Sequence, residues 1–183
     1  MERRRINTLR YVNNNLLTIK ELAGGILITL VNQVKPSTEI PSGFTQESII
    51  KICKQINPNS PLTHDFREPI TFRSHYEFIN FKTVKILSLV RELIILNDLL
   101  DEELLRGLTN VNDAIQRLTL KINIPPKEDM DMEFLGGSLY NLYQESNELV
   151  YYFKKIYDKK YSFQYHKNEI ERNKRRKIEI PTT

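Results

Sequence analysis

The sequence predicts an all-α protein, in the form of an elongated helical hairpin or coiled-coil-like bundle that helices of partner subunits complete. Apolar residues recur at alternating spacings of three and four along most of the chain, as they do on one face of an α-helix. No segment alternates apolar and polar residues beside hairpin turn residues, as paired strands would. The apolar faces are also wider than a small bundle would cover, which predicts association with other helices.

The first predicted helix runs from about residue 6 to residue 34, and residues 1–34 form the first of four expected regions. Asn14 and Lys20 lie off its apolar face, and Pro36 ends it. We call its apolar residues the first-helix stripe. The stripe keeps 3-4 spacing over three heptads and consists of Leu9, Val12, Leu16, Ile19, Ala23, Ile26 and Leu30.

Two similar segments, ELAGGILITL and EFLGGSLYNL, each place two adjacent glycines inside a predicted helix. They contain Gly24-Gly25 and Gly136-Gly137. Glycine is less favourable than alanine by about 1 kcal/mol in a helix interior, so the pairs need a reason. We predict that the helices are unbroken and that both pairs mark close helix crossings, with a local kink as the alternative.

Residues 35–72 form the second region, a Pro-rich insertion that holds five of the eight prolines. Within it, residues 45–57 predict a short helix that begins after Thr45 and ends before Pro58.

Residues 73–165 contain the remaining helices. Residues 74–105 predict one helix that is apolar over more than half of its circumference and should therefore be buried on several sides. Residues 107–122 predict a shorter helix, and residues 129–161 predict the last one. The apolar seam of this last helix consists of Leu135, Leu139, Leu142, Ser146, Leu149, Phe153 and Ile156.

Charge is distributed unevenly around the formal net value of +4: residues 1–10 carry +3, residues 11–150 carry −5 and residues 151–183 carry +6. Residues 166–183 form the fourth region, a basic tail. The single cysteine suits a reducing compartment, and we expect no membrane span because no run of about 18 apolar residues occurs. Lys174, Arg175, Arg176 and Lys177 predict a nuclear import signal, with a solvated charged tail as the alternative.

No pattern in the sequence predicts catalysis, a metal site or a cofactor. The three histidines have no zinc-ligand spacing, and His64 beside Asp65 is better explained as part of a turn. The acidic residues 98–103 lack the spacing of a calcium loop, and neither glycine pair forms a phosphate-binding motif. Direct nucleic-acid binding stays open as an alternative, because the C-terminal segment mixes tyrosines with lysine and arginine.

The first helix, ERRRINTLRYVNNNLLTIKELAGGILITL, resembles the opening helix of the small head-module subunits of Mediator, the RNA polymerase II coactivator, especially subunit eleven. The segment LVRELIILNDLLDEELL resembles the second helix of subunit eleven and also that of its partner, subunit twenty-two. The resemblance covers about residues 2–34 and 74–106. The matching positions of the first helix are Arg5, Ile6, Leu9, Val12, Leu16, Ile19, Ala23, Gly24, Ile26 and Leu30.

The resemblance implies a non-catalytic nuclear subunit that pairs with its small helical partner in a four-helix bundle and joins the larger head subunit seventeen. It also implies a contribution to preinitiation-complex assembly. The implied partner-facing residues are the first-helix stripe together with Ile86, Val90, Leu93 and Leu100. Two alternatives remain: the same residues close an intramolecular core, or the chain belongs to another coiled-coil assembly such as a kinetochore or tethering complex.

Overall fold

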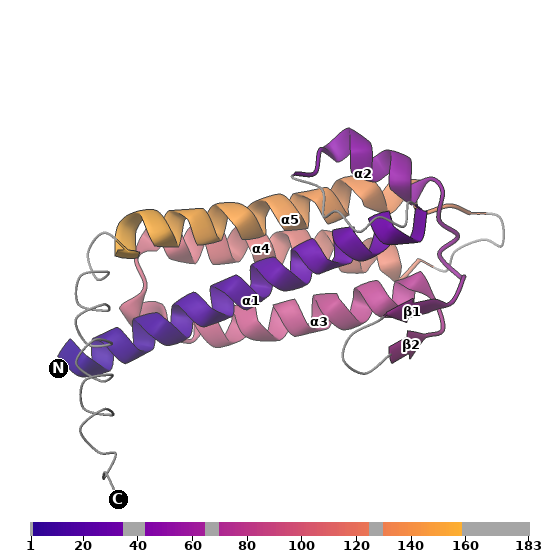
Figure 1. Cartoon of the computed structure of the whole chain (residues 1–183). Helices are drawn as coiled ribbons and strands as arrows, with labels where there is room; N and C mark the ends of the chain where they lie inside the picture. Colours follow the sequence, from indigo (N-terminus) through magenta and orange to yellow (C-terminus); the bar gives the residue numbers. More distant parts are fainter. Residues whose placement is uncertain (1, 35–42, 65–69, 125–129, 159–183) are drawn as a thin grey trace, which may run out of the picture.

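The computed structural model describes residues 2–34, 43–64, 70–124 and 130–158. Four long helices lie side by side in it: α1 (Glu2–Val34), α3 (His75–Ile94), α4 (Glu102–Ile122) and α5 (Glu133–Phe153) (Figure 1). α1 packs against α3 and α5, and α4 packs against the same two helices, so the four helices surround one core. We call this unit the four-helix body. The predicted all-α class is confirmed.

α1 is continuous over 33 residues, which confirms the unbroken helix predicted through the first glycine pair. It begins at Glu2, earlier than predicted, and no glycine among the described residues has a positive φ. The first-helix stripe is buried along the whole helix. The segment Asn7–Val34 is long and apolar enough to cross a membrane by length and composition alone. A core helix meets the same criterion, and α1 packs against α2, α3 and α5.

The prediction of a single helix over residues 74–105 is wrong, because the chain reverses direction within this segment. α3 ends at Ile94, a 3₁₀ turn η1 (Asn97–Leu99) follows, and α4 then begins at Glu102. Asp101 is the N-cap of α4: its carboxylate accepts a hydrogen bond from the backbone N–H of Leu104 at 2.8 Å. The cap and the acidic first turn explain why α4 starts here rather than at the predicted residue 107.

The insertion holds α2 (Gln46–Cys53) and two short strands, β1 (Leu62–His64) and β2 (Ile70–Phe72). Thr45 begins α2 as predicted, through a capping box with Ser48, but the helix ends four residues earlier than expected. The strands pair antiparallel with Leu62 opposite Phe72. The expectation that no strands pair was therefore wrong; strands of three residues are too short to show an alternating pattern.

α5 is shorter than the predicted helix over residues 129–161, and a π-helical turn, η2 (Lys154–Asp158), follows it. The seam residues from Leu135 to Phe153 are buried, whereas Ile156 is 41% exposed. The wider π turn shifts the helical phase, which takes Ile156 out of the seam. The predicted basic tail lies outside the described residues.

The close-crossing prediction is confirmed for the second glycine pair and wrong for the first. A Cβ at Gly136 would lie 2.8 Å from the Cα of Ile50, so the backbone of α2 rests directly on α5. A Cβ at Gly24 would make an ordinary contact with the ring of Tyr143, and a Cβ at Gly25 would meet nothing within 4 Å. A further close contact, at Gly107 against the side chain of Leu149, has no counterpart in the paired-glycine pattern.

Gly136→Ala is expected to lower the free energy of unfolding by about 1–3 kcal/mol, because the added methyl group would push α2 away from α5. Gly25→Ala is the matched control. It should raise the free energy of unfolding by about 0.5–1 kcal/mol, because alanine favours the helix and meets no neighbour there. Urea denaturation measures both changes. Shifts of the same sign in the two variants would contradict the close crossing.

Candidate docking surface

The structure places all of the predicted partner-facing residues inside the four-helix body of a single chain. None is more than 9% exposed. This is the arrangement expected if these residues close a core within one chain, since α3 and α5 cover the first-helix stripe. A partner cannot reach these side chains unless the body opens. The residues are Leu9, Val12, Leu16, Ile19, Ala23, Ile26, Leu30, Ile86, Val90, Leu93 and Leu100.

The predicted import cluster, Lys174 to Lys177, lies outside the described residues. Of the C-terminal tyrosines that the structure describes, Tyr151 is 70% exposed. Tyr152 and Tyr157 instead donate hydrogen bonds to Asp101, at 3.2 and 2.6 Å. Those two phenol groups therefore belong to the body rather than to an open stacking surface for bases.

The segment that contains α3 was predicted to be buried on several sides. The prediction is wrong for the outer side of α3, which is exposed. Its inner residues pack against α1 and α4, but its outer side carries exposed apolar side chains. Val84 is 56% exposed and Ile95, at its C-cap, is 77% exposed. Five of the ten large exposed apolar residues of the described chain lie on α3 and the turn that follows: Phe81, Val84, Ile94, Ile95 and Leu99.

Polar side chains border this apolar surface. The ammonium of Lys85 lies 4.3 Å from the centre of the Phe81 ring, in a cation–π contact. Tyr11 of α1 donates a hydrogen bond to Oε2 of Glu92 at 2.7 Å. We call the surface formed by Phe81, Val84, Lys85, Ser88, Glu92 and Ile95 the α3 outer face.

The other helices expose fewer large apolar side chains. α2 packs on α5, and Figure 1 shows it on the side of α5 that faces away from α3. The exposed residues of α4 from Thr109 to Arg117 are polar or charged, and Leu120 near its end is 70% exposed. The α3 outer face therefore exposes Val84 and Ile95 and, in part, Phe81, whose ring also packs against Phe72 of β2 with 5.5 Å between ring centres. Exposed apolar side chains of this kind mark a candidate interaction surface.

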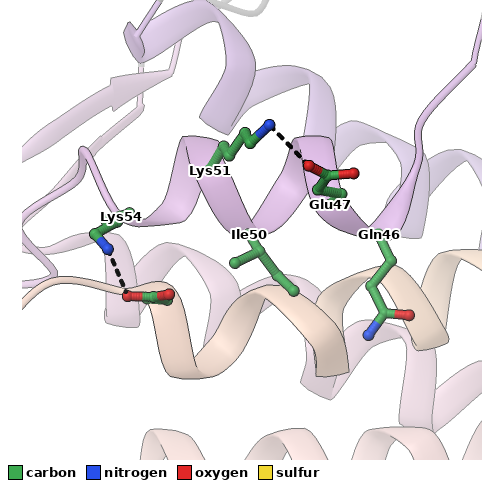
Figure 2. A pocket seen from close by; sticks show the side chains of 6 residues that line it. Gln46, Glu47, Ile50, Lys51 and Lys54 are labelled. Atoms are coloured by element: carbon green, nitrogen blue, oxygen red, sulfur yellow. Dashed lines mark ion pairs between the residues drawn. The ribbon is translucent and has the colours of Figure 1, made fainter.

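A second candidate is an open groove of about 510 Å³ between α2 and the start of α5 (Figure 2). It is lined by Gln46, Glu47, Ile50, Lys51, Lys54 and Glu133. In Figure 2 the side chains of Gln46 and Ile50 point toward α5.

The charges that border this groove neutralise one another. Lys51 pairs with Glu47 at 2.8 Å, and Lys54 pairs with Glu133 at 3.4 Å (Figure 2). The hydrogen bond and the charge of Lys51 lower the pKa of Glu47, so this carboxyl stays ionised at neutral pH. With two acids balancing two bases, the groove has no net charge to select an ionic ligand. The α3 outer face is the stronger candidate.

The Asp101 carboxylate joins three parts of the chain where α4 begins. It caps α4 and accepts hydrogen bonds from Tyr152 of α5 and Tyr157 of η2. Burial, and then the hydrogen bond to Asp101, raise the pKa of Tyr157 well above its ordinary value. Tyr157 also stacks on Phe153, with 4.8 Å between ring centres. The contacts hold the α3–α4 connection against the end of α5.

The buried reactive groups have structural environments. Burial, together with the charge of Asp131, raises the pKa of the Cys53 thiol to about 12, so the thiolate is scarce at neutral pH. Nδ1 of His75 lies 3.0 Å from the carbonyl oxygen of Ser60, and the ring is buried. Within the described ranges, no group of three or more His, Cys, Asp or Glu residues is placed to hold a metal ion.

Comparisons of the chain with protein families, with curated proteins and with solved structures find no match.

Asp101→Ala is expected to lower the free energy of unfolding by about 1–3 kcal/mol, because it removes a helix cap and leaves two phenol groups without their acceptor. Asp113→Ala on the exposed side of α4 is the matched control and should change stability by less than about 0.5 kcal/mol. Chemical denaturation followed by circular dichroism measures both. Equal effects of the two substitutions would show that Asp101 does not join these elements.

The stability of the chain is expected to fall as the pH drops below about 6.5, the ordinary pKa of histidine. Burial lowers the pKa of His75 in the folded state, so the unfolded chain binds the proton more readily. The contribution of His75 is fully present above the unfolded-state pKa and is lost as the pH falls from there through the folded-state pKa. His75→Asn places an amide N–H near the position of Nδ1 but does not titrate. Its urea midpoint should therefore depend less on pH than that of the wild type; parallel pH profiles would exclude His75 as the cause.

Proposed function

We propose that the chain is a non-catalytic subunit of a nuclear assembly, and specifically of the head module of Mediator, where it contributes to RNA polymerase II preinitiation-complex assembly by helix–helix association. The resemblance of residues 2–34 and 74–106 to the small head subunits supports the choice of assembly. The all-α architecture of the described residues is compatible with it.

The single observation that carries the proposal is the apolar α3 outer face. Burying apolar surface is worth about 25 cal/mol per Å², so exposed apolar side chains favour association with another surface. Phe81, Val84 and Ile95 lie on one side of α3, and exposed polar side chains lie between Val84 and Ile95. A helix of another subunit fits such a row by packing ridges into grooves.

The proposed mode of docking differs from the one that the resemblance implies. In the mode that the resemblance implies, the partner would cover the first-helix stripe, but α3 and α5 already cover that stripe in the single chain. We therefore propose that the small helical partner subunit or the larger subunit seventeen docks on the outside of the four-helix body, at the α3 outer face. A charged residue in place of the buried Ala23 would therefore disturb the core of the four-helix body and would not probe the docking surface.

The described residues support association over catalysis. Cys53 and His75 are the side chains best suited to nucleophilic or acid–base chemistry; both are buried, and neither lines the groove. Nucleic-acid binding is the second candidate and rests on the sequence of the C-terminal segment. Two of its tyrosines are engaged by Asp101, which weakens the support for it.

Affinity purification of the tagged chain from its native cell, with identification of the co-purifying proteins, tests the proposed assembly. We expect Mediator head subunits in the purified material, and their absence would refute the assignment. Strong, salt-dependent binding of DNA or RNA by the chain alone would instead favour the second candidate.

The double variant Val84→Lys/Ile95→Lys is expected to reduce recovery of the partner subunits about tenfold or more, because it places two cations in an apolar contact. Both positions are exposed, and lysine is a good helix former, so the four-helix body should keep its stability. Leu120→Lys is the matched control, since Leu120 is 70% exposed on α4. Quantitative mass spectrometry compares the three chains. Loss of the partner subunits from the Leu120→Lys control alone would refute docking at the α3 outer face and indicate that the docking surface lies on α4.

A further inference from the structure

We propose that, when no partner subunit is bound, a second copy of this chain covers the α3 outer face, with the two α3 helices antiparallel. The inference rests on the proposed function in one respect: it takes the α3 outer face to be a docking surface. It goes further by naming an occupant, which the charges along the face identify.

The charged residues of the face are complementary to a copy of themselves. Lys85 and Glu92 are seven residues apart, close to two full helical turns, so they lie on the same edge of α3. A two-fold axis that passes between the two α3 helices, perpendicular to both and level with the midpoint between Ser88 and Leu89, places each Lys85 opposite Glu92 of the other copy. One alignment thus forms two symmetric ion pairs, as a self-complementary interface requires.

The apolar residues fit the same alignment. Phe81 lies on one side of the axis and Ile95 lies a similar distance on the other, so each ring meets the isoleucine of the second copy. Ser88 lies next to the axis, where a small side chain lets the two helices approach closely. Both ends of the contact are therefore apolar, and the ion pairs lie between them.

The direction of pairing decides which charges meet. In a parallel pairing, the edge of α3 that carries Lys85 and Glu92 faces the opposite edge of the second copy, where Arg91 lies, so Glu92 would meet Arg91 and Lys85 would meet no acid. The antiparallel alignment instead pairs Lys85 with Glu92, and Arg91 falls level with Ile86 of the second copy, at the other edge of the helix. Reversing the charge of Lys85 therefore separates the two directions.

The contacts within one chain leave these groups able to pair across the axis. Tyr11 donates to Oε2 of Glu92, and a carboxylate has a second oxygen, Oε1, that can accept from a lysine. The ammonium of Lys85 rests on the Phe81 ring, and its flexible side chain can leave this exposed contact to reach the carboxylate. A partner subunit that docks on the same face would displace the second copy, so self-association and partner binding exclude each other.

Charge reversal tests the inference on the full chain. Sedimentation equilibrium over a range of concentrations should show a monomer–dimer equilibrium for the wild type. Lys85→Glu alone and Glu92→Lys alone should each raise the dimer dissociation constant about tenfold or more, because two ion pairs become two repulsions. Lys20→Glu, at an exposed position of α1, is the control and should leave the constant unchanged.

An equimolar mixture of the two single variants is the decisive measurement. In a mixed dimer every acid again faces a base, so dimerisation should return to the wild-type level, and the double variant should dimerise equally well. A wild-type chain that stays monomeric at every concentration would overturn the inference, and so would a dimer that neither reversal weakens.

These outcomes are separable from those of the proposed function. A monomeric wild type whose Mediator partners are lost with Val84→Lys/Ile95→Lys would refute the second copy and support the proposed docking. A dimer that shows the charge-reversal pattern, from a chain that co-purifies with no Mediator subunit, would support the second copy and refute the proposed assembly.

Discussion

The burial of the first-helix stripe between α3 and α5 is the constraint on which the rest of the structure depends. A helix of 33 residues with an apolar stripe along its length is stable only if neighbouring helices cover that stripe. Two helices of about 20 residues on either side do so, and α4 fills the remaining position between them. The chain must reverse direction after α3 to allow this, and Asp101 fixes the start of the returning helix.

The helices could be predicted from the sequence because their apolar spacing is regular, but the reversal after α3 could not be found in the same way. Apolar residues continue through the turn, at Ile95, Leu96, Leu99 and Leu100, so the hydrophobic pattern has no gap. The readable signal was local: Asp101 followed by two glutamates is an N-cap with an acidic first turn. The paired strands carry no comparable signal, because three residues cannot establish a period of two.

The candidate site was predictable only in part, for a physical reason. The spacing of a stripe reports that one face of a helix is buried, and it is silent about which chain does the burying. The first-helix stripe was therefore correctly identified as a packing surface. Only the positions of α3 and α5 show that the same chain covers it. The glycine pairs show the same limit: equal spacing around Gly24 and Gly136 does not reveal that α2 crosses only the second.

Closure of the four-helix body is the reason why we propose the α3 outer face as the surface for association. Each long helix has two long neighbours, so each also has one outward side. α2 packs against α5 and α1, while α4 turns mainly polar residues outward between Thr109 and Arg117. α3 and its C-cap expose Phe81, Val84 and Ile95, whereas the other long helices expose large apolar side chains at Tyr11, Leu120 and Tyr151. A chain that covers these side chains gains their burial. In the proposed scheme, in which a partner subunit and a second copy share one face, the concentration of free chain sets how tightly a partner must bind.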